Sequence, residues 1–276
     1  MTSGEPLITR ISSLLPPRAS WVLVGIVGYT VAGRLAREHL MARLFGEAAW
    51  AGMSGDRQHR AVLYVLSTVN AAALTAIGLK NMAEIYRSSP PKRPDELVLE
   101  YLNRLSQTSM EREEHVVEGY GALNLMSGYM LHDFLSTIHE WARYKDQWFH
   151  HVFSLGLLGS IFQFARIPQA RQYVGLGNSI VIMDASTVFL NLCWFLRESG
   201  RSNTRFYRFC LAMFVSLFFA LRCVLIPNLV FNLIYKLPHV SEPLFGGVKP
   251  LLAGAVGLQF YWAWHILKGL ASRKLA

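Results

Sequence analysis

The sequence is poor in charged residues. Asp, Glu, Lys and Arg make up 16% of its 276 residues, whereas hydrophobic residues make up 52%. A soluble globular domain carries about 25% charged residues. The net charge of +9 does not indicate a nucleic-acid partner, because the basic residues lie between apolar runs, as they do beside membrane spans. The composition therefore predicts a membrane protein that binds no nucleic acid.

Cysteine is scarce as well, and no Asn-x-Ser/Thr glycosylation sequon occurs. The three cysteines, Cys193, Cys210 and Cys223, lie inside apolar runs and have no framework spacing. A zinc site is also not expected at His150-His151, because neighbours on a helix point roughly 100° apart and paired ligands prefer spacings of three or four. We therefore expect no disulfide, no metal and no resident cofactor.

Apolar runs that approach the roughly 20 residues needed to cross a bilayer recur along the chain. They predict an all-α, polytopic membrane protein with six to seven transmembrane helices around a central, polar-lined cavity, because backbone groups in lipid must be satisfied within helices. The first run has about the length of a signal-peptide core, so its retention stays open. The seven candidate spans are residues 20–35, 61–79, 116–135, 148–165, 173–196, 207–230 and 251–267.

These runs divide the chain into three parts. Residues 1–60 hold the first span and a polar loop, residues 61–268 form the main transmembrane domain, and residues 269–276 are a short basic tail. After a proline-rich stretch, residues 95–107 have the pattern of a short amphipathic surface helix. The basic residues are divided almost equally between the two sides of the membrane, so the orientation stays open.

Ionisable residues within the apolar runs are the candidates for function, because they are costly in lipid and usually face the interior of a bundle. His132 and Asp133 lie at the end of the third run, and His150 and His151 open the fourth. By helical spacing, Asp133 shares a face with Ser136 and Glu140, and His132 shares one with Ser136 and His139. Histidines at a wetted helix end are the plain alternative.

Asp184, Thr187 and Asn191 in the fifth run are spaced by three and four and so share one helix face. Arg222 lies within the sixth run. Counting the helical rise along both runs brings Asp184 and Arg222 within about 8 Å of each other in depth, a gap that a long arginine can close. The sequence therefore predicts an Asp184–Arg222 ion pair, whose role is either structural or part of a site.

The order of these residues resembles the TLC domain, the membrane domain shared by ceramide synthases, translocating-chain-associated proteins and less understood relatives. The resemblance is carried by Gly128-Tyr129 with Asp133, by His150-His151, and by the string from Asp184-Ala185-Ser186 through Leu190-Asn191 to Trp194. It covers roughly residues 61–268 and is nearest to the TLC-domain proteins that are not ceramide synthases. It implies a location in the endoplasmic reticulum or a related endomembrane.

The ceramide synthase pattern implies a catalytic set of His150, His151 and Asp184. At three further positions this sequence departs from that pattern. Met183 stands where those enzymes carry histidine, Thr187 where they carry a second aspartate, and Asn191 where they carry glutamate.

Two classes of function follow. The first is a protein that binds or regulates membrane lipids without chemistry, with His132, Asp133, Thr187, Asn191 and Arg222 contacting lipid. The second is an N-acyltransferase with acyl-CoA as co-substrate, in which a histidine oriented by Asp184 takes the proton of the attacking amine. The missing acidic residues favour the first. A transporter is less favoured, because no repeated half with broken helices is evident. Membrane lipids are the expected partners, and a homo- or hetero-oligomer stays open, as do the lipid and the organelle.

Overall fold

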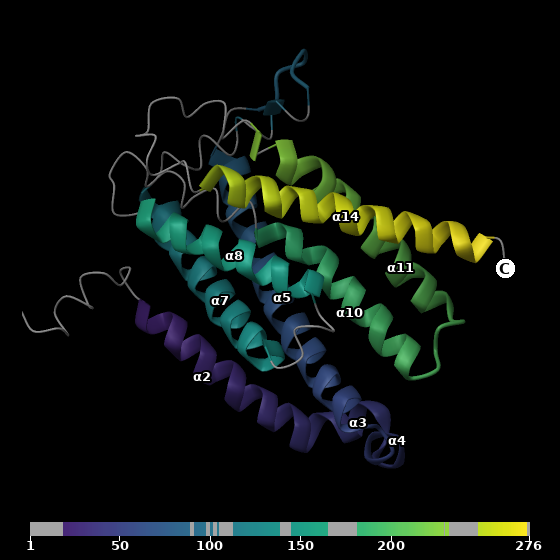
Figure 1. Cartoon of the computed structure of the whole chain (residues 1–276). Coiled ribbons are helices and arrows are strands. Elements are labelled where there is room, and N and C mark those ends of the chain that lie inside the picture. The colour runs from purple at the N-terminus through teal and green to yellow at the C-terminus, as the bar shows by residue number, and fades with distance from the viewer. Residues whose placement is uncertain are drawn as a thin grey trace, which may run out of the picture.

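The computed structural model describes residues 19–88, 91–97, 100, 101, 104, 113–138, 145–164, 181–228, 230, 231 and 248–274. Every regular element among these residues is helical (Figure 1). The elements are α2 (Ala19–Leu35), η1 (Ala36–Leu40), α3 (Met41–Phe45), α4 (Glu47–Ala51), α5 (Gly55–Ser88), α7 (Glu113–Thr137), α8 (Lys145–Phe164), η4 (Ile182–Asp184), α10 (Ala185–Glu198), α11 (Arg205–Leu217), η5 (Phe218–Leu225) and α14 (Val248–Lys274).

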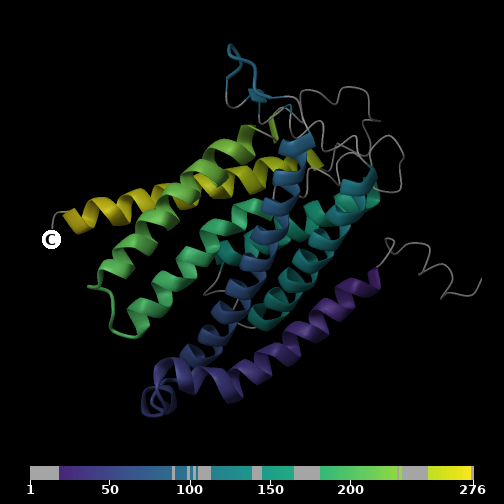
Figure 2. The ribbon, with the colours of Figure 1, turned by 180° about the vertical axis from the view of Figure 1, so that it is seen from behind.

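The long helices form a closed ring. α5 packs on α7, α7 on α8, α8 on α14, α14 on η5 at the end of α11, α11 on α10, and α10 back on α5. α2 lies outside this ring along α7, as the views from both sides show (Figures 1 and 2). The expected helical bundle is therefore present, with six of its helices in the ring and the first one beside it.

The segment expected to be a polar loop between the first two spans is folded. Residues 36–51 form η1, α3 and α4. Met41 is fully buried there in a hydrophobic cluster with Ala36, Ala61 and Trp194. These apolar contacts join the connection to the start of α5 and to α10, which explains why it does not form an open loop.

The outer faces of the helices are apolar. On α14, Phe260, Tyr261, Trp264 and Leu267 are all about half exposed or more. Large exposed hydrophobic side chains also follow α2, from Leu23 to Leu35. Contiguous apolar surface of this kind is rare on soluble monomers and is the surface that lipid covers.

Two helices among the described residues are long and apolar enough to cross a membrane, Gly55–Lys80 and Arg205–Asn228. The six to seven spans predicted from the sequence are thus not confirmed as a number. α2 has only 17 residues, and α7 carries ionisable groups such as Asp133 along its length. Such groups lower the hydropathy of a helix even when they face the bundle interior.

The predicted surface helix at residues 95–107 lies largely outside the described residues. Within its described part, Glu100, Tyr101 and Arg104 are helical. Arg104 donates hydrogen bonds at 2.9 Å to both carboxylate oxygens of Glu96. These bonds hold the pKa of the Glu96 carboxyl at about 2, well below its usual value.

α2 and α7 approach each other closely at two glycines. A Cβ atom on Gly128 would lie 3.0 Å from the Cα of Gly25 and 3.2 Å from the carbonyl oxygen of Val22. Both neighbours are backbone atoms of a helix, which cannot move aside as a side chain can. Small residues that allow two helix backbones to meet are the usual means of packing helices in a membrane.

We predict that Gly128→Ala loosens the contact between α2 and α7. Overpacking at a close contact costs about 1–3 kcal/mol, so the melting temperature of the purified protein in detergent should fall. Gly121→Ala is the matched control on the same helix, because a Cβ there meets nothing within 4 Å. That control should be neutral or stabilising, since alanine is the better helix former. Equal melting temperatures for the two variants would contradict the predicted backbone contact.

Candidate functional site

A cavity of about 590 Å³ lies inside the ring. All six ring helices line it, from His59 on α5 to Ile266 on α14, whereas α2 contributes no lining residue. Its polar side chains come from α5, with His59, Arg60, Ser67 and Asn70 among them, and from α7, α8, η4 and α10. Its apolar wall includes Phe214, Phe218 and Trp262 from α11, η5 and α14. The size falls within the range of roughly 300–1,000 Å³ that is typical of small-molecule sites.

An apolar cluster closes one end of this cavity. On α7, Met126 precedes Asp133, and on α8, which runs the opposite way (Figure 1), Leu158 follows His151. The cluster therefore occupies the same end of both helices. At the other end the lining residues Asp146 and His265 are exposed. The cavity thus has a closed apolar end and reaches the surface at the end where α8 begins.

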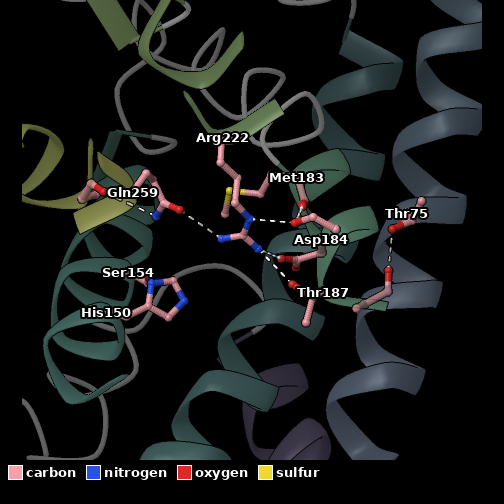
Figure 3. Close-up of polar contacts among 11 residues, drawn as sticks. Thr75, His150, Ser154, Met183, Asp184, Thr187, Arg222 and Gln259 are labelled. Carbon is pink, nitrogen blue, oxygen red and sulfur yellow. Dashed lines mark hydrogen bonds and ion pairs between the residues drawn. The ribbon is translucent and has the colours of Figure 1, made fainter. Parts of the chain in front are cut away.

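Arg222 lies at the centre of the polar wall (Figure 3). Its side chain is buried and donates four hydrogen bonds: from Nη2 to Oδ1 of Asp184 at 3.1 Å and to Oγ1 of Thr187 at 2.9 Å, from Nε to Oγ of Ser186 at 3.0 Å, and from Nη1 to Oε1 of Gln259 at 3.4 Å. The predicted Asp184–Arg222 ion pair is therefore present. Together, the four hydrogen bonds of Arg222 join η5 to η4, α10 and α14.

The backbone on both sides of this ion pair departs from a regular α-helix. Arg222 lies in η5, a π-helix that continues α11. Asp184 ends η4, a tight turn of 3-10 helix that leads into α10. A π-helical turn changes the direction of the side chains relative to the helix before it, and such turns are frequent at functional sites. Both irregular turns lie where the buried charges meet.

A second buried pair joins α7 to α8. Nε2 of His151 lies 2.8 Å from Oδ2 of Asp133, and the two side chains are only 3% and 2% exposed. Gln147, one turn before His151, donates from Nε2 to the same Asp133 oxygen at 2.9 Å. Nδ1 of His151 is buried and has no hydrogen-bond partner among the described residues. A histidine held by a carboxylate at one nitrogen has its other nitrogen left to interact with a ligand.

His150 points away from this pair, toward α14. Its ring lies 5.2 Å from that of Trp262, and its Nδ1 lies 3.4 Å from Oγ of Ser154. It lines both the main cavity and a small apolar pocket of about 60 Å³. The neighbouring histidines thus face different partners, as their helical spacing predicts.

A model of the TLC domain, titled for TRAM, LAG1 and CLN8, matches residues 60–268, which is more than half of the chain. The chain belongs to the TLC-domain family. No curated protein matches its sequence. The matched region of this TLC-domain protein is nearly the same as the stretch from His59 to Ile266 that lines the cavity.

Among the residues predicted from the sequence, His150, His151, Asp133, Thr187 and Asn191 all line the cavity, together with Asp184 and Arg222. One expectation, the partner of the histidine, was wrong in geometry. His132 does not line the cavity: its ring packs 6.1 Å from that of Tyr29 on α2, because it is one residue out of phase with Asp133. His139 and Glu140 lie outside the described residues.

The correction concerns the partner of the histidine. The ceramide synthase pattern implied a histidine oriented by Asp184, but the carboxylate beside His151 is Asp133. Asp184 is engaged by Arg222 instead. Asp133 lies near the same end of the ring as His151, whereas Asp184 lies deeper.

Sequence reasoning also missed Gln259 and Gln147. Gln259 is a polar residue in the middle of the last apolar run, 5% exposed. Such a residue inside a candidate span is a signal in itself, because its amide must find partners within the bundle. Gln147 gave no comparable signal, since it lies among polar residues before the fourth run.

We predict strong coupling between Asp184 and Arg222. Asp184→Leu or Arg222→Met leaves one buried charge alone and should cost about 3–5 kcal/mol of stability, whereas removing both with apolar residues should cost less than either single change. Unfolding in detergent of the wild type, both single variants and the double variant measures the coupling. Arg197 and Glu198, a surface pair 3.9 Å apart in which Arg197 is exposed and Glu198 is partly buried, supply the control cycle, for which coupling below about 1 kcal/mol is expected. Additive losses at the buried pair would refute the coupling.

Proposed function

We propose that this TLC-domain protein binds or regulates membrane lipids and carries out no catalysis of its own. The observation that carries the proposal is a ligand-sized cavity, about 590 Å³, that has a polar wall inside a bundle with an apolar exterior. Membrane-associated proteins of this family are linked to lipids, and an amphipathic cavity suits a molecule with a polar head and an aliphatic chain. Membrane lipids are the partners that we propose, in the endoplasmic reticulum or a related endomembrane.

We propose that the protein crosses the membrane several times. The apolar outer faces of α2 and α14 support this, in addition to the two helices that meet the length and composition of a span. We propose six to seven spans, with residues 61–268 as the lipid-binding domain, residues 1–60 as an N-terminal segment and residues 269–276 as a short tail. The location of α2 outside the ring is consistent with an accessory first span.

The residues at the three positions where ceramide synthases carry acid–base groups support a non-catalytic role. Met183 is buried in the apolar cluster that closes the cavity. Thr187 accepts a hydrogen bond from Arg222, and Nδ2 of Asn191 donates to the backbone oxygen of Tyr64 at 3.4 Å. Each of these side chains contributes to packing or to a helix contact, and none of them can exchange a proton near neutral pH.

One observation favours the alternative, an N-acyltransferase of the ceramide synthase type. The His151–Asp133 contact of 2.8 Å is the arrangement of an oriented general base. In such a reaction the amine nitrogen attacks the acyl-CoA thioester carbonyl, the new C–N bond forms, and the C–S bond breaks. His151 would take the proton that the nitrogen loses and pass it to the departing coenzyme A thiolate, which leaves as the thiol.

One experiment separates the two functions. The full chain, purified into lipid nanodiscs, is extracted for mass spectrometry of bound lipid and is separately incubated with acyl-CoA and a sphingoid base. We expect a lipid enriched over the surrounding bilayer and no amide product at any pH tested. His151→Ala should then change the identity or amount of the bound lipid, because it removes a polar group from the cavity wall.

His39→Ala is the matched control, since His39 is exposed on η1 and does not line the cavity. It should leave the bound lipid unchanged. Amide formation by the wild type that falls by about a hundredfold or more in a folded His151→Ala variant would overturn the proposal in favour of the acyltransferase. Absence of any enriched lipid would refute lipid binding itself.

A further inference from the structure

The inference drawn here rests on the proposed lipid binding and concerns the headgroup that the cavity accepts. Its starting point is His151, which lines the cavity and is only 3% exposed. Both ring nitrogens of His151 are buried and make no hydrogen bond among the described residues. Nε2 is in ion-pair contact with Asp133 at 2.8 Å, and Nδ1 is left for a ligand. A buried polar atom left unpaired costs about 1–3 kcal/mol. A ligand group that hydrogen-bonds Nδ1 would remove this cost.

Four of the charged or titratable side chains that line the cavity, Arg222, Asp184, Asp133 and His151, are engaged with one another in two pairs. Arg222 has five N–H donors, of which four are directed at Asp184, Ser186, Thr187 and Gln259. An anionic headgroup such as a phosphate would have to displace Asp184 from the guanidinium. That exchange would leave a buried carboxylate without its partner, which is strongly unfavourable.

A cationic headgroup meets the same difficulty. Asp184 is held by Arg222, and Asp133 is held by His151 and Gln147. A quaternary ammonium, for example, would replace the N–H donors on one of these carboxylates and offer no hydrogen bond in return. The inner cavity therefore suits a polar group that has no net charge.

A hydroxyl group meets these conditions best. It donates one hydrogen bond and accepts others, so it can pair with Nδ1 of His151 whichever nitrogen carries the proton. The size of the cavity limits the rest of the ligand. A cavity of about 590 Å³ lies within the range of roughly 300–1,000 Å³ that is typical of small-molecule sites. A site of this size suits one aliphatic chain with a small head.

The apolar wall provides contacts for such a chain. Phe214 and Phe218 form a buried cluster with Ala263, and Trp262 and Ile266 pack against it. All of these except Ala263 line the cavity, from α11, η5 and α14. We propose that the cavity binds an uncharged, single-chain lipid alcohol, such as a long-chain alcohol or a monoacylglycerol, with its hydroxyl on His151.

A headgroup series at constant chain length tests this proposal. A photoreactive hexadecanol is crosslinked to the full chain in nanodiscs and competed with unlabelled hexadecanol, monopalmitoylglycerol, hexadecyl sulfate and hexadecyltrimethylammonium. The two alcohols should compete at concentrations about tenfold lower than either charged probe, a factor that corresponds to about 1.4 kcal/mol. A charged probe that competes as well as hexadecanol, or better, would overturn the proposal.

Variants locate the hydroxyl. His151→Leu should weaken competition by the alcohols by roughly tenfold, as expected for one lost hydrogen bond to a buried group, and should leave competition by the charged probes unchanged. His39→Leu, on the exposed face of η1, should change neither. A folded His151→Leu variant that keeps the wild-type preference for alcohols would overturn the assignment to His151. If that variant does not fold, the wild-type headgroup series still decides the ligand class.

The outcomes also distinguish this proposal from the function on which it rests. If enriched lipid co-purifies with the protein but no alcohol competes, the lipid-alcohol proposal fails and lipid binding stands. If no lipid is enriched and no probe crosslinks, both fail.

Discussion

The structure depends on how one buried guanidinium is satisfied. Arg222 is 6% exposed inside a bundle whose exterior is apolar, where an unpaired cation would be very costly. Its planar fork contacts groups on η4, α10 and α14 at once. Because all of these groups must lie within hydrogen-bond distance, the guanidinium fixes the position and rotation of η5 relative to η4, α10 and α14. The polar wall of the cavity follows from that arrangement.

This use of Arg222 divides the polar residues into two groups with different roles. The Asp184–Arg222 pair lies among helices that it connects, and its hydrogen bonds are directed at protein groups. In the Asp133–His151 pair, Gln147 donates to Asp133, and within the part of the chain that the structure describes Nδ1 of His151 has no hydrogen-bond partner. A bundle with all its charges arranged like the first pair would be stable but would have no group left to recognise a ligand.

The Asp184–Arg222 pair could be predicted from the sequence, because a charged residue within an apolar run usually faces the interior of the helical bundle. Asp184 and Arg222 had to face inward, and the rise of a helix gave their depths. The partner of His151 could not be predicted in this way, because the contact depends on the rotation of α7 against α8. His132 shows the same limit. It directly precedes Asp133 on α7, so its side chain points about 100° away from that of Asp133 and contacts Tyr29.

The departures from the ceramide synthase pattern are consistent with this division of roles. Met183 and Asn191 serve packing and a helix contact, and Thr187 completes the shell around Arg222. A second carboxylate at position 187 would give Arg222 two anionic partners, so threonine keeps the charges of the inner cavity balanced. His151 keeps its carboxylate, Asp133, on a different helix from these positions. The acid–base groups of the fifth run can therefore be absent while His151 stays paired with Asp133 at the cavity wall.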